Sequence, residues 1–455
     1  MDYVTHTEQD YKKILSELKI EKIDDLLKAI PSHIRPNTLN LESGKSEIEV
    51  KQYLHGLLKK NTIKQNSISF LGAGVYHHFI PEVISSLISR GEFLTAYTPY
   101  QPEISQGLLQ STWEYQQLMA HITGMEVSNA SLYDGGTAVV EAVIMASQIQ
   151  KKNKIIISET LNPQYIEVLK TYNLSNKFNF VFVPEKKGLS DIQKIKSLLD
   201  DQTAGVVMPY INYLGNLEPF DSVSELAHNV GALFVSTYYP IASGLYQTPG
   251  KRGADIVVGE AQSLGIPLNF GGPYLGFITS RKAYVRYLPG KIVGKTTDGK
   301  GQEAFVLTLQ AREQHIKREK ASSNICSNEA LCALRASIYL SLMGEKGLCS
   351  VAQKSYERAH YFYDKIKPLS FVKPKYHHEF FNEFVVEFSS SELRNTIMSK
   401  LEKENIFIGV PLNEKDLLIA TTEMNTKEEI DFVVNAIENK GEIDITVSRI
   451  KDYTK

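Results

Sequence analysis

The chain has 455 residues, 42% of them hydrophobic, which is enough for one large domain, a smaller one and an extensive core. Its formal net charge is −2 with acidic and basic residues interspersed, which argues against a nucleic-acid-binding surface and a polybasic membrane patch. No apolar run approaches a membrane-spanning length without charges, and the polar, acidic start lacks the pattern of a secretory signal.

Cysteine usage favours a reducing compartment. Cys326, Cys332 and Cys349 are few, odd in number and not in a metal-binding spacing. We therefore expect a soluble cytoplasmic protein without functional disulfides, whose partners are small molecules and other proteins.

Residues 1–65 are predicted to form a helical arm. Helical periodicity alternates here with Pro, Asn and Ser breaks. Thr7 and Ser46 each precede an acidic first turn and are predicted to be helix N-caps. We expect the arm to be structural and to pack on a partner subunit.

The run from Ser69 to His78 is predicted to be a strand that enters a glycine turn, followed by a helix over 81–89. Gly72 and Gly74 match only part of a nucleotide fingerprint, because the third glycine is missing. The adjacent pair His77 and His78 has no third ligand at helical spacing, so no metal site is predicted.

Residues 95–107 (TAYTPYQPEISQG) are predicted to form a binding loop. Two prolines fix the backbone and would hold Tyr97, Tyr100 and Glu103 in set positions. An interface loop whose tyrosines only pack is an equal alternative, because tyrosine is also enriched at subunit interfaces.

Two helices are predicted next, over 108–122 and up to about residue 147. The second begins near Gly135, Gly136 and Thr137, a turn that can hold a phosphate because free backbone amides and the helix dipole point at it.

Short apolar strands then alternate with helical patterns up to about residue 276. This alternation predicts a mostly parallel sheet covered by helices on both faces. After helices over 328–343 and 349–366, a smaller αβ layer is predicted from a strand at 383–388, a helix at 391–404, a strand at 417–421 and a helix at 427–438. We therefore divide the chain into the arm at 1–65, a large α/β domain at 66–325 and a small C-terminal α/β domain at 326–455.

Three long segments carry a family resemblance: FLTAYTPYQPEISQG, GEAQSLGIPLNFGGPYLGF and LTLQAREQHIKREKASSNICSNEAL. They resemble glycine dehydrogenase (decarboxylating), the P-protein of the glycine cleavage system, and more narrowly subunit 1 (alpha) of its split form. The resemblance implies the fold of pyridoxal-phosphate (PLP) dependent transferases, aminotransferase fold type I. It also implies that the region of Arg312, His315 and Asn324 borders the partner's cleft.

The resemblance shows two departures from a working PLP site. Ser263 stands where this fold carries the lysine that binds the cofactor covalently, and a hydroxyl cannot replace an amine there. Thr237 stands where an aspartate pairs with the pyridine nitrogen. We therefore expect no covalent cofactor in this chain and regard the turn at Gly135, Gly136 and Thr137 as a vestigial phosphate site.

The implied function is that of one subunit of glycine decarboxylase. The resemblance implies a PLP-bearing subunit 2 (beta) as partner, an α2β2 assembly, and the lipoamide of H-protein as co-substrate. It also implies that Tyr76, Tyr97, Tyr100 and Glu103 support the partner's active site. One alternative is a structural or regulatory pseudoenzyme that only stabilises the partner. Another, weaker one is a self-sufficient PLP enzyme that uses Lys251, Lys282 or another lysine.

Overall fold

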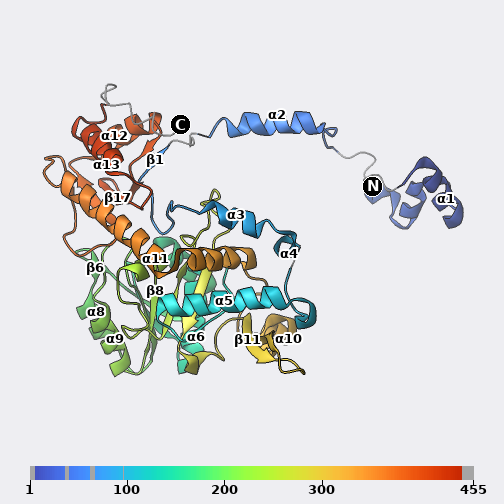
Figure 1. Cartoon of the computed structure of the whole chain (residues 1–455), viewed down its shortest axis with the longest axis horizontal. Coiled ribbons are helices and arrows are strands. Elements are labelled where there is room, and N and C mark those ends of the chain that lie inside the picture. Colours follow the sequence, from blue (N-terminus) through green and yellow to red (C-terminus); the bar gives the residue numbers. More distant parts are fainter. Residues whose placement is uncertain (1–5, 36–39, 62–66, 96, 443–455) are drawn as a thin grey trace. The chain divides into compact units, whose positions relative to one another are not determined.

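A computed structural model of the chain describes residues 6–35, 40–61, 67–95 and 97–442 (Figure 1). The chain divides into two units, Met1–Thr62 and Ile63–Lys455. Within the described ranges, no helix combines the length and the apolar character that a membrane crossing needs.

The first unit contains short helices with exposed apolar side chains. The predicted caps are confirmed, because Thr7 and Ser46 each form a capping box with the acidic residue three positions later. The segment after residue 22 forms a 3₁₀ helix. None of the described residues in these helices is buried, so their apolar side chains have no core within the unit. The elements are α1 Glu8–Leu18, η1 Ile23–Ala29, η2 Ser32–Ile34 and α2 Glu47–Leu58.

The second unit is built on a seven-stranded sheet with the order β2-β10-β9-β8-β7-β3-β4. The five strands from β9 to β4 are parallel, while β10 runs antiparallel to both of its neighbours. The short apolar strands predicted before residue 276 are confirmed as β3, β4, β7, β8 and β9. The bounds are β2 Val127–Ser128, β3 Lys154–Ser158, β4 Asn179–Val183, β7 Thr203–Pro209, β8 Leu233–Thr237, β9 Ile256–Glu260 and β10 Gly276–Ser280.

Alternating side chains of these strands enter two cores, as a strand buried on both faces requires. On β3, Ile156 joins one core, whereas Ile155 and Ile157 join the other. Helix α5 lies beside α11 on the first face (Figure 1), and α6 with α7 supplies the second core. The helices are α3 Glu82–Ile88, α5 Gln106–Thr123, α6 Gly135–Gln150, α7 Pro163–Tyr172, α8 Ile192–Leu198, α9 Phe220–Asn229 and α11 Ala330–Ile366.

Helix α11 connects the large sheet to a second, four-stranded antiparallel sheet. The two helices predicted at 328–343 and 349–366 form one element that breaks at Gly344, whose φ of 58° favours glycine. The strand at 383–388 and the helix at 427–438 have the predicted bounds. The elements are β13 Val372–Pro374, β14 Glu383–Phe388, α12 Ser391–Lys403, β16 Val410–Pro411, β17 Asp416–Ala420 and α13 Lys427–Glu438.

The strand predicted from Ser69 is wrong in length, because β1 comprises only Ile68–Ser69 and pairs with the two residues of β15, Ile406–Phe407. The chain from Phe70 to Phe79 then runs without regular structure, and we call it the strap. The remaining elements are α4 Gly91–Leu94, η3 Pro102–Ile104, β5 Glu185–Lys186, β6 Leu189–Ser190, η4 Pro240–Gly244, η5 Lys282–Tyr284, β11 Ile292–Thr297, β12 Glu303–Thr308, η6 Gln310–Arg312, α10 Gln314–Lys317 and η7 Arg318–Lys320.

Candidate functional site

A small cavity lies at the carboxyl ends of the parallel strands, the place where open α/β sheets bind ligands. We call it the inner pocket. Its volume is about 70 Å³, well below the ~300 Å³ at the lower end of small-molecule sites. The lining residues are Gly74, Tyr76, Asn162, Tyr165, Pro209, Ile211, Asn212, Tyr213, Thr237, Tyr238, Tyr239, Gly259, Glu260 and Glu383.

The two positions singled out for PLP chemistry lie at this end of the sheet. Thr237 is the last residue of β8 and lines the pocket. Ser263 follows β9, is buried, and its hydroxyl has no hydrogen-bond partner among the described residues. Lys251 and Lys282 are exposed and are not among the residues that line the pocket. Neither of them is placed to bind a cofactor there.

The amides at the start of α6 are already hydrogen-bonded by the chain's own carboxylates. Gly135 N–H donates to Glu260 Oε2 at 3.0 Å, and Thr137 N–H donates to Asp134 Oδ1 at 2.7 Å. Glu260 Oε1 also accepts from the N–H groups of Gln262 at 2.9 Å and Leu275 at 2.8 Å. The predicted phosphate turn is therefore the capped first turn of a helix.

Burial raises the pKa of Glu260 to about 7, although its three N–H donors act in the opposite direction. Three residues, Glu260, Ser263 and Thr237, determine whether PLP could bind in the inner pocket. The covalent anchor and the pyridine partner are absent, and the phosphate position is filled. The inner pocket does not fit PLP.

Tyr76 joins the strap to both sheets. Its hydroxyl donates to Glu383 Oε2 on β14 at 2.5 Å, and its backbone N–H donates to Gln262 Oε1 at 3.0 Å. Glu383 Oε1 also accepts from Ala73 N–H at 2.6 Å. Burial raises the pKa of Glu383 to about 7. Tyr76 is thus a buried residue that holds the strap in place.

A second carboxylate, that of the partly buried Glu423, fixes the end of the strap. Its Oε2 contacts His78 Nδ1 at 2.6 Å, and its Oε1 accepts from Phe79 N–H at 2.7 Å. His78 Nε2 hydrogen-bonds the hydroxyl of Tyr239. Burial acts most strongly on the pKa of Glu423 and raises it, but the hydrogen bond and charge of His78 and the N–H of Phe79 together outweigh burial and hold that pKa below its usual value.

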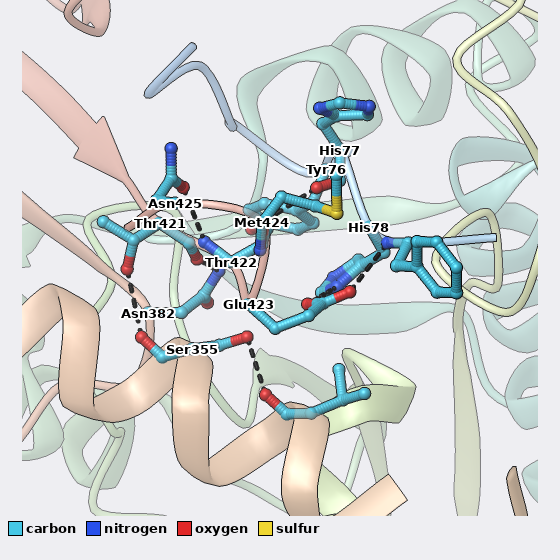
Figure 2. Close-up of polar contacts among 12 residues, drawn as sticks. Tyr76, His77, His78, Ser355, Asn382, Thr421, Thr422, Glu423, Met424 and Asn425 are labelled. Atoms are coloured by element: carbon cyan, nitrogen blue, oxygen red, sulfur yellow. Dashed lines mark hydrogen bonds and ion pairs between the residues drawn. The ribbon is translucent and has the colours of Figure 1, made fainter. Parts of the chain in front are cut away.

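The two adjacent histidines face different surroundings. Figure 2 shows His78 turned toward Glu423 and His77 turned away from it. Within the described ranges, no three His, Cys, Asp or Glu side chains are grouped so that they could hold a metal ion. The pair therefore belongs to the contact between the strap and the loop 421–425.

The residues of the predicted binding loop lie apart from Tyr76. Tyr97 is 81% exposed, and its hydroxyl lies 2.9 Å from Ser327 Oγ. The ring of Tyr100 lies 5.6 Å from that of His315, with Lys291 Nζ 5.2 Å from its centroid. Glu103 is exposed in η3. We call Tyr97–Glu103 the tyrosine loop.

Arg312 lies in the segment against which the tyrosine loop packs. Its Nη1 donates to Arg286 O at 3.4 Å, whereas Nε and Nη2 are buried without a partner in the described part of the chain. Burial lowers the pKa of this guanidinium. Its neighbour Glu313 lies 3.4 Å from Lys291 Nζ. The segment is thus rich in charged groups that are only partly paired.

Sequence reasoning missed the three carboxylates Glu260, Glu383 and Glu423. Each takes at least one hydrogen bond from a segment distant in the chain. The only local signal was for Glu260, an acidic residue at the end of an otherwise apolar strand, where an unpaired charge is costly.

Comparison with solved structures identifies the fold of the chain. The sphingosine-1-phosphate lyase of Burkholderia pseudomallei aligns with a TM-score of 0.65 at 11% identity, covering 93% of this chain and 96% of that one. At this identity the likeness shows the fold alone. The chain thus has the α/β fold of PLP-dependent transferases, fold type I.

Closer relatives identify the family. The family model of the glycine cleavage system P-protein matches residues 1–437. A probable glycine dehydrogenase (decarboxylating) subunit 1 from Carboxydothermus hydrogenoformans is 44% identical over 444 residues, 96% of this chain and 99% of the relative. A crystal structure of inhibitor-bound glycine decarboxylase (P-protein) aligns with a TM-score of 0.90 at 38% identity and covers 97% of this chain and 100% of that one. This chain belongs to the glycine cleavage system P-protein family.

Proposed function

We propose that this chain is the cofactor-free subunit of a two-chain glycine decarboxylase of the glycine cleavage system. Its partner is subunit 2 (beta), a homologous chain that carries PLP on its own lysine, in an α2β2 assembly. Family membership supports the activity. The observation that carries the division of labour is the inner pocket, where Glu260 occupies the phosphate position and Ser263 replaces the lysine.

In the assembly, PLP on the partner supplies the electron sink for loss of CO2 from glycine, and the lipoamide of H-protein receives the aminomethyl group. This chain contributes the groups that it presents at its surface. We assign this contribution to Tyr97, Tyr100 and Glu103, because all three are exposed on a loop that two prolines stiffen. The closure of the partner's cleft excludes water from the reaction.

Tyr76 has a different task in this proposal. Its buried hydroxyl donates to Glu383, so it acts as a positioning residue that holds the strap between the two sheets. A strap held in this way gives the partner a fixed surface to pack on. The arm, whose apolar side chains have no core within its own unit, is proposed to pack on the partner as well.

We place the assembly in the cytoplasm. The three cysteines are free, and Cys332 is buried, which suits a reducing compartment.

The experiment is exchange of labelled bicarbonate into glycine with lipoylated H-protein. It is run with this chain alone, with the PLP-bearing partner alone and with the mixture. Exchange that requires both chains is the expected result. Equal exchange by the partner alone would show that this chain contributes nothing to the reaction.

A closed inner pocket also suits a second candidate, a structural pseudoenzyme that only stabilises the partner. The tyrosine loop separates the two functions. If Tyr97→Phe and Glu103→Gln leave the turnover of the assembled complex unchanged, the structural role is correct.

A further inference from the structure

We propose that Glu260 is a built-in substitute for a cofactor phosphate, and that it closes the inner pocket to PLP and to other phosphate-bearing ligands. This makes Glu260 a specificity-determining residue that acts by exclusion. The inference concerns this chain's own pocket and holds whether or not the proposed division of labour is correct.

Glu260 accepts the hydrogen bonds that a bound phosphate would need. A phosphate at a helix N-terminus is bound by free backbone N–H groups and by the helix dipole. Here Gly135 N–H, the first amide of the sixteen-residue helix α6, donates to Glu260 Oε2. The other carboxylate oxygen accepts from the N–H groups of Gln262 and Leu275, on either side of the turn that follows β9. One buried carboxylate therefore takes up three amides that could otherwise serve an anion.

The space around Gly135 is too small for a phosphate. A β-carbon built on Gly135 would lie 2.1 Å from the hydroxyl oxygen of Tyr165 and 3.2 Å from the β-carbon of Glu260. The tyrosine and the glutamate therefore pack directly on the glycine, where a phosphate would have to sit. The whole inner pocket has a volume of only about 70 Å³.

The negative charges at the start of α6 would repel a phosphate. A second carboxylate, that of Asp134, accepts a hydrogen bond from Thr137 N–H, two residues beyond Gly135. A phosphate that entered would meet Asp134 and, when ionised, Glu260 across a low-dielectric gap, where repulsion between like charges is large. Donors, space and charge thus all disfavour a phosphate here.

The test uses the full-length chain at pH 8, with inorganic phosphate and PLP as probes. Isothermal calorimetry measures phosphate binding, and equilibrium dialysis with absorbance measures PLP. The variant Glu260→Ala removes the carboxylate and vacates its volume. We expect its phosphate affinity to exceed that of the wild type by about tenfold or more, a difference of ~1.4 kcal/mol. Glu260→Gln keeps the volume and is expected to stay closed.

Two further variants keep the test decisive. Glu141→Gln removes another buried carboxylate of α6, away from the inner pocket, and is expected to leave phosphate binding at the wild-type level. Glu260→Ser serves in place of Glu260→Ala if the alanine variant does not fold, which its circular dichroism will show.

Two results would overturn the proposal. One is equal phosphate affinity of the wild type and a folded Glu260→Ala or Glu260→Ser variant. The other is phosphate bound to Gly135 N–H in wild-type crystals soaked in phosphate, which tests the exclusion without any substitution.

Discussion

The inner pocket and the tyrosine loop differ in whether their polar side chains are buried or exposed. In the inner pocket, Glu260 and Glu383 are buried and receive their hydrogen bonds from the chain itself. In the tyrosine loop, Tyr97 is 81% exposed and Glu103 is also exposed. The carboxylates of the inner pocket are hydrogen-bonded within the chain, whereas the loop leaves its polar side chains available to another chain.

A chain of this fold that carries no cofactor, as we propose here, has to satisfy the donors that a cofactor would otherwise bind. Removing a charged ligand leaves buried donors unsatisfied, which costs about 1–3 kcal/mol for each group. Glu260 accepts one such hydrogen bond at the start of α6, and the strap lines the pocket with Gly74 and Tyr76. Groups that serve another protein then have to lie at the surface, as the tyrosine loop does.

The largest expected effect comes from truncating Glu383, a side chain that lines the inner pocket. Glu383→Ala removes the acceptor of Tyr76 Oη and Ala73 N–H and leaves a cavity between the two sheets. We expect the free energy of unfolding to fall by about 3 kcal/mol. Chemical denaturation measures it, with Glu387→Ala, an exposed residue on the same strand, as the control. Equal effects of the two variants would contradict an essential role of the pocket network.

The pH dependence of the free energy of unfolding tests the role of the buried Glu383 as well. The folded pKa of Glu383 is about 7, above its ordinary value of 4.5, so the folded state binds more protons between these values. Stability should therefore fall as pH rises from about 4.5 through about 7, by up to ~1.4 kcal/mol per pH unit. Glu383→Gln should make the profile flatter in this window. An unchanged profile would show that Glu383 is ionised throughout.

An intermediate effect is expected in the tyrosine loop. The double variant Tyr97→Phe and Tyr100→Phe removes two hydroxyls while keeping the rings. We expect kcat/KM of the assembled complex to fall about tenfold, with the melting temperature unchanged. Tyr172→Phe, a half-exposed tyrosine of α7, is the control. A loss of assembly with normal turnover of the remaining complex would instead make the loop an interface element.

The smallest effect is expected for Glu103→Gln. The side chain is exposed in the short helix η3, and exposed charges contribute little. Turnover of the complex should fall about threefold or less, and more at low than at high salt. A hundredfold loss would show that Glu103 becomes buried on assembly and contacts the reacting groups.

Much of the fold follows from local sequence. The strands around Ile156 and Val257 are apolar on both faces and therefore indicate a parallel sheet, and the caps at Thr7, Ser46 and Thr426 are local hydrogen bonds. The division into an arm and two domains at 1–65, 66–325 and 326–455 stays a prediction.

The candidate site was less predictable. Glu260 takes its donors from Gly135, Gln262 and Leu275, and only the folded sheet brings these three together. The family resemblance grouped Tyr76 with Tyr97 as supports of the partner's active site, but one is buried and the other exposed. Ser263 and Thr237 are visible as single residues in the sequence, whereas the hydrogen bond of Glu260 at the start of α6 is a property of tertiary structure.

The most direct test of the account is the location of PLP in the assembled complex. The complex of this chain and its partner is reduced with borohydride, digested and mapped for labelled lysines, and its total PLP is counted. The account predicts one PLP for each pair of chains, with the label only on the partner. A labelled lysine in this chain, Lys251 and Lys282 included, would contradict it.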